Sequence, residues 1–323
     1  MHIDVYLVLG SAVVGLLVGM TGMGGGALMT PMLVLVFGVA PSAAISSDLV
    51  AALFMKPAGV AIHWRRKTVH TEIVKLLCVG SIPAAFLGTY VMHLMGQSAG
   101  AEHHLQLLLG AALVIGALAM IGRSLVTKQR REASSAPIVR TVPTVLVGVG
   151  GGFMVGLTSV GAGSLIMVFL LLLYPTMRSD QLVGTDLAQS VPLTLGATGG
   201  TLLFGHVAFA LTASLILGSV PAVVLGSLVS SRGANYLVRP IITGVVLLSG
   251  LKYLGLPPGG LAIAALPTAI VVLAAVLRAK VAYDLGPLST ASEGDLNRTG
   301  PESVPEAVED IVSLLPTRLH GDA

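Results

Sequence analysis

The chain has 323 residues, of which 54% are hydrophobic and only 10% are charged, and its formal net charge is +3. An ordinary soluble domain carries about 25% charged residues, so this chain lacks the polar surface that one or two water-soluble domains need. The composition excludes a soluble protein, and the small positive charge is read as a signal of membrane topology rather than of nucleic-acid binding.

Long uncharged runs predict the class of protein. No charge occurs in residues 5–47, 141–177 or 187–231. Each run exceeds the roughly 20 residues that cross a bilayer as a helix. The single cysteine, Cys78, excludes an intramolecular disulfide and a cysteine-based metal cluster. We therefore expect an all-α integral membrane protein without a cofactor or metal.

The first predicted half, residues 1–122, begins with an apolar element at 5–36 that is broken at 21–26. A continuous helix of this length would measure about 48 Å, too long for a hydrocarbon core of about 30 Å, whereas two full spans need about 40 residues and a turn. A re-entrant pair of shorter helices fits better. The full spans that follow are predicted at 43–63, 71–95 and 103–122.

A linker at 123–140 with five basic residues separates this half from the second, predicted at 141–255. The second half repeats the pattern, with a broken element at 141–173 and spans at 181–203, 207–231 and 237–255. An extra span is predicted at 261–280. The tail at 284–323 carries eight acidic and two basic residues, and its composition predicts disorder.

The two halves are related in sequence. Residues 15–28 recur at 152–165 with seven of fourteen positions identical at an offset of 137. At an offset of 138, two further pairs match: Asp48 with Asp186, and residues 80–88 with residues 218–226, where six of nine are identical. These matches indicate an internal repeat.

The 18 Lys and Arg residues distinguish a parallel repeat from an inverted one. If each broken element crosses the membrane once, ten of these basic residues are cytoplasmic. If each broken element returns to the side from which it entered, sixteen are cytoplasmic, Lys252 is outside and Lys56 lies within the membrane. Cytoplasmic loops are enriched in Lys and Arg, which favours the second arrangement. It has two inverted repeats, about seven full spans, two re-entrant hairpins, the N-terminus outside and the tail inside. Inverted repeats with discontinuous helices are typical of secondary transporters.

Three motifs carry a resemblance to a known family: Gly-x-Thr-Gly-x-Gly-Gly-Gly at 19–26, Gly-x-Thr-Ser-x-Gly-x-Gly-Ser at 156–164, and the Gly-Ser-x-Pro-Ala...Leu-Gly pair at 80–88 and 218–226. Over about residues 5–255 the chain resembles the sulfite exporter TauE/SafE family of permeases. The resemblance implies two related halves and transport, across the cell membrane, of sulfur-containing anions such as sulfite and sulfonates. The acidic tail lies outside it.

The residues themselves also suggest an anion site. In a re-entrant hairpin the second helix begins at the tip, so its unpaired N–H groups and partial positive charge face the membrane centre. Two facing tips would present these groups to an anion, and nearby hydroxyls could donate to its oxygens. The predicted substrate-binding residues are Thr21, Gly24, Gly25, Gly26, Thr158, Ser159, Gly161, Gly163, Ser164 and, as an amide donor, Gln189. An alternative is that the glycines only permit close helix packing.

Asp48, Asp186 and Lys56 are predicted within the bilayer, where ionisable residues are costly and usually functional. We assign them to coupling or gating, with protons as the candidate coupling ion. A second interpretation is that both acids are N-cap or first-turn residues. Lys56 follows Asp48 by about two turns, and its repeat counterpart is the neutral Thr194.

The predicted function is secondary transport of a small anion, with the lipid bilayer and protons as the other partners and no nucleic acid. An anion channel and a non-transport membrane scaffold are the alternatives. An intramembrane enzyme would need a nucleophile beside a base, and Ser164 has no evident partner of that kind in the sequence.

Overall fold

All regular elements in the described part of the chain are helices. The computed structural model describes residues 4–21, 25–65, 67–96, 100–127, 139–161, 163, 165–205, 207–229, 235–270, 272–273 and 276–277. The chain divides into two units, Met1–Val276 and Leu277–Ala323. The predicted tail at 284–323, most of the linker at 123–140 and the end of the predicted span at 261–280 lie outside the described residues.

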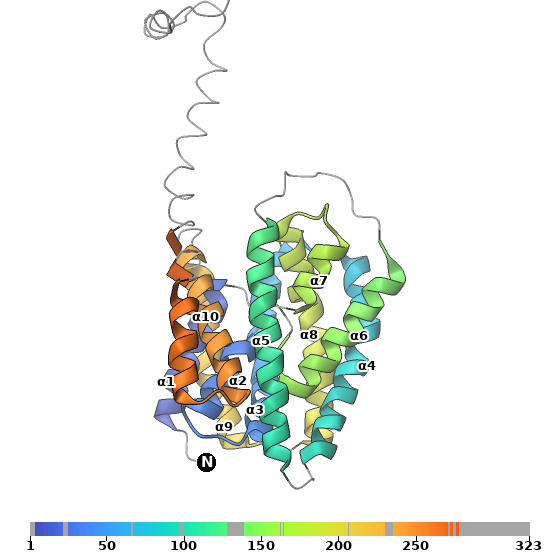
Figure 1. The fold of residues 1–323 in the computed structure, drawn as a ribbon. Coiled ribbons are helices and arrows are strands. Elements are labelled where there is room, and N and C mark those ends of the chain that lie inside the picture. The colour runs from blue at the N-terminus through green and yellow to red at the C-terminus, as the bar shows by residue number, and fades with distance from the viewer. Residues whose placement is uncertain are drawn as a thin grey trace, which may run out of the picture. The chain divides into compact units, whose positions relative to one another are not determined.

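The first half contains five helices (Figure 1). The broken element consists of α1 (Val5–Thr21) and α2 (Gly26–Leu35), with Gly25 as the N-cap of α2. Three longer helices follow: α3 (Pro41–Arg65), α4 (Thr71–Gly96) and α5 (Ala101–Thr127).

The second half has the same order of short and long helices. Its broken element consists of α6 (Thr141–Thr158) and α7 (Leu165–Leu173), and the helices that follow are α8 (Ser179–Phe204), α9 (Phe209–Val229) and α10 (Asn235–Tyr253). A further short apolar helix, Pro258–Ile270, covers the first part of the extra span.

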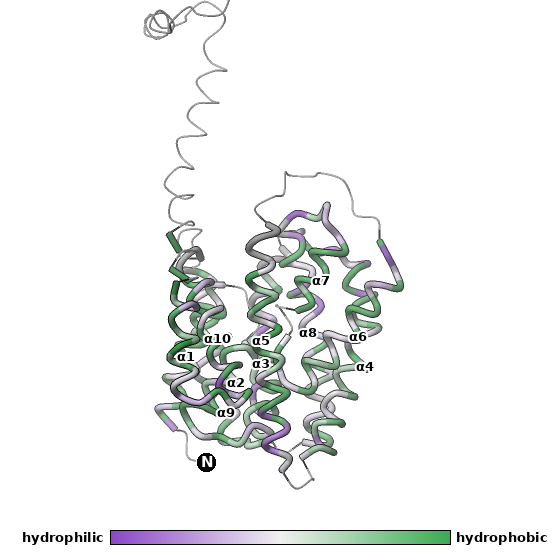
Figure 2. The backbone as a smooth tube through the Cα atoms, viewed as in Figure 1, coloured by the Kyte–Doolittle hydropathy of each residue, from purple (hydrophilic) through white to green (hydrophobic). Residues whose placement is uncertain are grey.

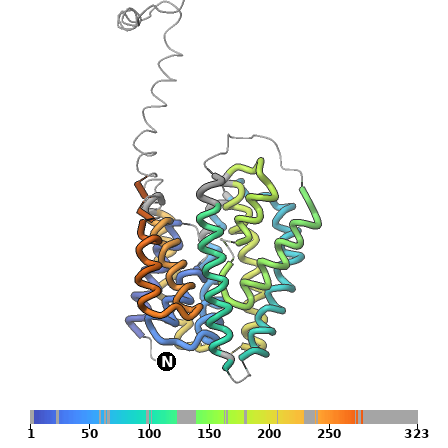
Figure 3. Tube along the Cα trace, viewed as in Figure 1, coloured from blue at the N-terminus to red at the C-terminus, as the bar shows by residue number. Residues whose placement is uncertain are grey.

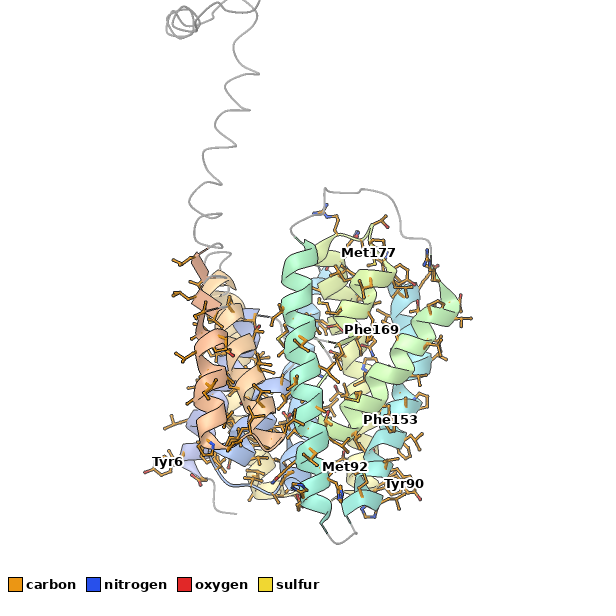
Figure 4. The ribbon with its side chains drawn as sticks, in the orientation of Figure 1. Tyr6, Tyr90, Met92, Phe153, Phe169 and Met177 are labelled. Carbon is orange, nitrogen blue, oxygen red and sulfur yellow. The ribbon has the colours of Figure 1, made fainter. Side chains whose placement is uncertain are left out.

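The outer surface of the helices is apolar. Figure 2 shows hydrophobic residues along their length, and Figure 4 shows Tyr6 on α1 projecting outward, with 77% of its surface exposed. Phe169 on α7 is 50% exposed. Within the described residues, four helices have the length and composition of a membrane span: Thr71–Gly96, Glu102–Gly122, Thr141–Thr158 and Phe209–Leu228. Such a surface is stable against lipid and unstable in water, so the protein spans a membrane several times.

The first helix of each half packs on the other half. α1 packs along α9, and α6 packs along α4; Figures 1 and 3 show the second pair side by side. A Cβ added to Gly15 would lie 2.6 Å from the carbonyl oxygen of Ser219, and one added to Gly152 would lie 2.4 Å from that of Ser81. In each contact a glycine of the 15–28 or 152–165 repeat meets a serine of the 218–226 or 80–88 repeat. The two backbones approach so closely that only glycine fits.

Two apolar clusters fill the interior. One is built from residues of α1, α2, α3, α5, α9 and α10, with Met29, Leu33 and Leu215 among its fully buried members. The other is built mainly from α4, α6, α7 and α8, where Ile166 and Leu193 are fully buried. Helices α3 and α5 contribute residues to both clusters. α3 therefore lies between the two clusters, each of which includes residues of a broken element.

The helix boundaries correct one interpretation of the acids. α3 begins at Pro41 and α8 at Ser179, so Asp48 and Asp186 are each the eighth residue of a helix. An N-cap or first-turn residue must lie at the helix start, where the N–H groups are unpaired. The capping interpretation is therefore wrong, because both acids lie about two turns inside.

Candidate functional site

The breaks of the two broken elements touch each other. Gly26 opens α2, and a Cβ added to it would lie 1.9 Å from the carbonyl oxygen of Ser159, the C-cap of α6. Ser159 has a left-handed backbone with φ 60°. Gly25 lies beside Met55 of α3, since its added Cβ would be 3.4 Å from Met55 Cε. The structure thus brings Gly26 of the first break to Ser159 of the second, while Gly25 lies beside α3.

Asp48 is a fully buried carboxylate beside this contact. Its Oδ2 accepts a hydrogen bond from Thr30 Oγ1 at 2.8 Å and another from Ser159 Oγ at 2.8 Å. Thr30 belongs to α2, and Ser159 follows α6. One carboxylate oxygen on α3 therefore connects both broken elements through charge-assisted hydrogen bonds.

The second oxygen of Asp48 has a different environment. Oδ1 is buried, and among the described residues it has no hydrogen-bond partner; the same holds for the hydroxyls of Ser46 and Ser47. Leaving an ionised oxygen in this state is costly. The described residues contain no group of three His, Cys, Asp or Glu side chains placed to hold a metal ion.

The second break depends on backbone conformations that favour glycine. Gly161 has φ +123° and Gly163 has φ +113°. Leu165 is the first residue of α7, and its N–H donates a hydrogen bond to the carbonyl oxygen of Gly161 at 3.1 Å. The remaining predicted residues of the two breaks, Gly24 and Ser164, lie outside the described residues.

The hydroxyls of Thr21 and Thr158 turn back along their own helices. Thr21 Oγ1 donates to the Leu17 carbonyl at 2.7 Å, and Thr158 Oγ1 donates to the Met154 carbonyl at 2.7 Å. A threonine hydroxyl has one proton. In this arrangement neither proton is directed to an anion between the breaks.

Gln189 is a buried link between helices. Its Nε2 donates to Ser81 Oγ on α4 at 2.9 Å. Its Oε1 is buried and has no hydrogen-bond partner within the described part of the chain. The amide donor predicted for the substrate is thus directed to α4 here.

Lys56 links α3 to α8. The partly buried Lys56 donates from Nζ to Thr194 Oγ1 on α8. Asp48 lies on the same helix as Lys56, about two turns before it. Asp186 is itself buried, with 2% of its surface exposed.

Thr30 and Ser81 were missed by the sequence reasoning, although they bond Asp48 and Gln189. Thr30 had a weak signal, as a polar residue before Pro31 in an apolar run. Ser81 lies in the repeated motif at 80–88. Neither signal identifies the residue that each side chain faces, because that depends on helix packing.

A cavity elsewhere does not suit an anion. Its volume is about 300 Å³, and it lies between α1, α2 and α10, lined by apolar side chains such as Leu17, Met32 and Ile242 together with Ser249. An apolar wall offers a charged solute no compensation for lost water. The contact between the breaks is therefore the candidate site.

The helices have apolar surfaces, two helical elements are interrupted, and ionisable side chains are buried beside the interruptions. These features are typical of multi-pass membrane transporters. The chain belongs to the sulfite exporter TauE/SafE family, whose model matches residues 7–253. That range contains nearly all of the helices from α1 to α10. The protein is thus a membrane transporter of this family.

Two relatives from Bacillus subtilis (strain 168) are similar over most of their lengths. Probable membrane transporter protein YjnA is 39% identical over 255 residues, which are 77% of this chain and 99% of the relative. Probable membrane transporter protein YdhB is 20% identical over 239 residues, which are 73% of this chain and 92% of the relative. No solved structure matches the chain.

Proposed function

We propose that the protein is a secondary transporter of small anions of the sulfite and sulfonate type, with protons as the coupling ion. The anion class is supported by the description of the family as a sulfite exporter. It is also supported by the contact between Gly26 and Ser159, which brings a helix N-terminus of one half to the break of the other. Helix N-termini attract anions.

The two halves are proposed to be inverted in the membrane. The corresponding helices α3 and α8 support this, because Lys56 meets Thr194 while Leu49 accepts a hydrogen bond from Thr198 at 3.0 Å. Residue numbers rise along one helix as they fall along the other, so the pair is antiparallel. In a parallel repeat, equivalent helices would run in the same direction.

The corresponding helices α5 and α10 give the same support. Met120 of α5 contacts Thr243 of α10, and a Cβ added to Gly110 would lie 2.8 Å from Tyr253 Cβ. This pair is antiparallel as well. We therefore propose seven full spans and two re-entrant hairpins in the cell membrane, with the N-terminus outside and the C-terminal tail in the cytoplasm.

Asp48 carries the coupling proton in this proposal. When Asp48 is ionised, its charge stands beside Ser159 and repels an anion at the breaks. A proton on Oδ1 removes that charge, while Thr30 and Ser159 continue to hold Oδ2. Proton and anion then bind together, and neither binds well alone.

The transport test uses purified protein in vesicles with sulfite, thiosulfate, a sulfonate and acetate as probes. A carrier saturates and exchanges labelled for unlabelled anion, whereas a channel conducts without exchange and a scaffold moves nothing. We expect exchange of a sulfur anion and uphill uptake driven by a pH gradient. A channel-like record, or no binding and no flux for every probe, contradicts the proposal.

Asp48→Asn tests the coupling assignment. Exchange of labelled anion should survive, while uptake driven by a pH gradient falls by at least about tenfold, which corresponds to a loss of about 1.4 kcal/mol. Asp4→Asn is the matched control, because Asp4 is exposed before α1. Full pH-driven uptake by the Asp48→Asn protein means that this acid does not carry the proton.

Cysteine accessibility tests the orientation on a Cys78→Ala background. A cysteine at position 96 should react with an impermeant reagent from outside, and cysteines at 65, 130 and 232 only after permeabilisation. If the cysteine at 232 reacts with the reagent only from outside, the inverted arrangement is wrong.

A further inference from the structure

The apolar cavity between α1, α2 and α10 has room for a ligand of its own. Its volume is about 300 Å³, and apart from Ser249 its walls are side chains of Leu, Ile, Val, Met, Ala and Pro. A water molecule needs about two to four polar partners, and an apolar cavity of about 150 Å³ stays dry and binds benzene. A single hydroxyl does not supply those partners. The ligand that suits this cavity is therefore apolar.

The cavity opens on the surface that faces lipid. Three of its lining residues, Val36, Ile241 and Val245, are exposed on the outside of the helices. Deeper in the wall, Val14 of α1 is buried, and Ile242 of α10 has only 2% of its surface exposed. The cavity is thus continuous with the contact between protein and bilayer, where the apolar molecules are lipid acyl chains.

The length of the cavity fits one such chain. Its lining residues on α10 run from Val238 to Ser249, a step of about 16 Å along the helix axis. The hydrocarbon core of a bilayer is about 30 Å thick, so the chains of one leaflet extend over about 15 Å. An acyl chain that lies along α10 therefore fills the cavity over its whole length.

Part of the cavity wall is α2, the short helix that follows the first break. Leu28 and Pro31 line the cavity, and Thr30 between them donates its hydrogen bond to Asp48. α2 has ten residues, and Pro31 inside it has no N–H with which to bond the Ala27 carbonyl. Most of the stability of so short a helix comes from tertiary packing. A ligand in the cavity adds to that packing on the side of α2 away from Asp48.

We propose that this cavity binds one acyl chain of a bilayer phospholipid, which packs against α2 and thereby supports the hydrogen bond from Thr30 to Asp48. The proposal rests on the membrane assignment and does not depend on the transported anion or the coupling ion. The tail at 284–323 is a poorer occupant, because it carries eight acidic residues that an apolar wall does not compensate.

Labelling from the lipid side tests this. The full-length protein is placed in vesicles of phosphatidylethanolamine and phosphatidylglycerol that contain a phospholipid with a diazirine on one acyl chain, and mass spectrometry maps the adducts. Ile242 should be labelled despite its burial, because a chain in the cavity reaches it. Val246 is the matched control, since it is fully buried one turn further along α10 and does not line the cavity; it should stay unlabelled. Adducts on the exposed Val245 without adducts on Ile242 overturn the proposal.

A variant that fills the cavity gives a second measurement. Val14→Phe places a ring among the lining residues, whereas Val13→Phe, the matched control, adds the same ring to an exposed neighbour. Phospholipid added to the purified protein in detergent should raise the melting temperature of the wild type and of Val13→Phe by at least about 3 °C, and that of Val14→Phe by less than half as much. Equal rises in all three proteins overturn the proposal. If Val14→Phe does not fold, the comparison of Ile242 with Val246 in the wild type decides.

A photoactivatable leucine in place of Leu17, another lining residue, identifies the occupant. An adduct with phospholipid supports the proposal. A cross-link to a second copy of the protein, or to a peptide from 284–323, means that protein fills the cavity and overturns it. None of these measurements uses transport, so failure of the lipid site and failure of the proposed function are told apart.

Discussion

The two breaks share a glycine-rich sequence, but they need their glycines for different physical reasons. At the first break Gly25 has an ordinary helical φ of −60°, and Gly26 is limited by space, because its Cβ would meet the Ser159 oxygen. At the second break Gly161 and Gly163 are limited by conformation, with φ above +100°. An added Cβ on Gly161 would lie 3.3 Å from Leu165 Cδ1, so a small shift of that side chain could accommodate it. A repeated motif thus identifies equivalent positions in the two halves, but the physical reason for glycine can differ between them.

Gly26→Ala should have the largest effect. The new methyl group overlaps a backbone oxygen, which cannot rotate away, so the cost should exceed the roughly 1–3 kcal/mol of ordinary overpacking. We expect little folded protein in the membrane. Gly25→Ala is the matched control, because its Cβ would meet only the flexible end of Met55. Equal yields of the two variants would mean that the breaks do not touch.

Thr30→Val and Ser159→Gly compare the two breaks through the same acid. Each removes one hydrogen bond to Asp48 Oδ2. A hydrogen bond to a charged group contributes about 1.5–3 kcal/mol, which Thr30→Val should lose in full. Ser159→Gly should cost about 1 kcal/mol less, because glycine removes the strain of the left-handed φ.

Chemical or thermal unfolding of the purified variants measures this difference. A larger loss for Ser159→Gly than for Thr30→Val would contradict the assignment of backbone strain to the second break.

Gly161→Ala and Gly163→Ala should each lower stability by about 1–2 kcal/mol, because an L side chain rarely adopts their φ values. Gly150→Ala is the control on α6, where the added Cβ meets nothing within 4 Å. It should stabilise the helix by up to about 1 kcal/mol. Melting temperatures compare the three, and a Gly161→Ala protein as stable as Gly150→Ala would show that conformation does not limit this break.

Thr21→Ala and Thr158→Ala should have the smallest effect, about 0.5–1.5 kcal/mol or less on stability, since each hydroxyl bonds its own helix backbone. Anion affinity should stay within about threefold of wild type, which corresponds to less than 1 kcal/mol. A thermal-shift titration with sulfite measures both quantities. A tenfold loss of affinity would mean that the hydroxyls turn toward the anion.

Local signals made much of the helix pattern predictable. Glycine clusters interrupt apolar runs, and the predicted span at 43–63 corresponds to α3 at Pro41–Arg65. Proline is favoured at the first position of a helix, so Pro41 was a usable sign that Asp48 lies well inside. The partners of the site residues were not predictable, because Asp48 and Ser159 are 111 residues apart and meet only through packing. The hydroxyl direction of Thr21 depends on its rotamer, which the sequence does not encode alone.

The crossed pairing of α1 with α9 also sets an order of folding. Between the end of α1 at Thr21 and the start of α9 at Phe209 the ribosome must add most of the chain. At about 5–20 residues per second this takes roughly 10–40 seconds. α6 can pack on α4 as soon as it enters the membrane, because α4 has already been made. The glycine face of α1 lacks α9 throughout that interval. A newly made chain is therefore most open to mispairing with a neighbouring copy at α1, whose own contact forms only when α9 has been made.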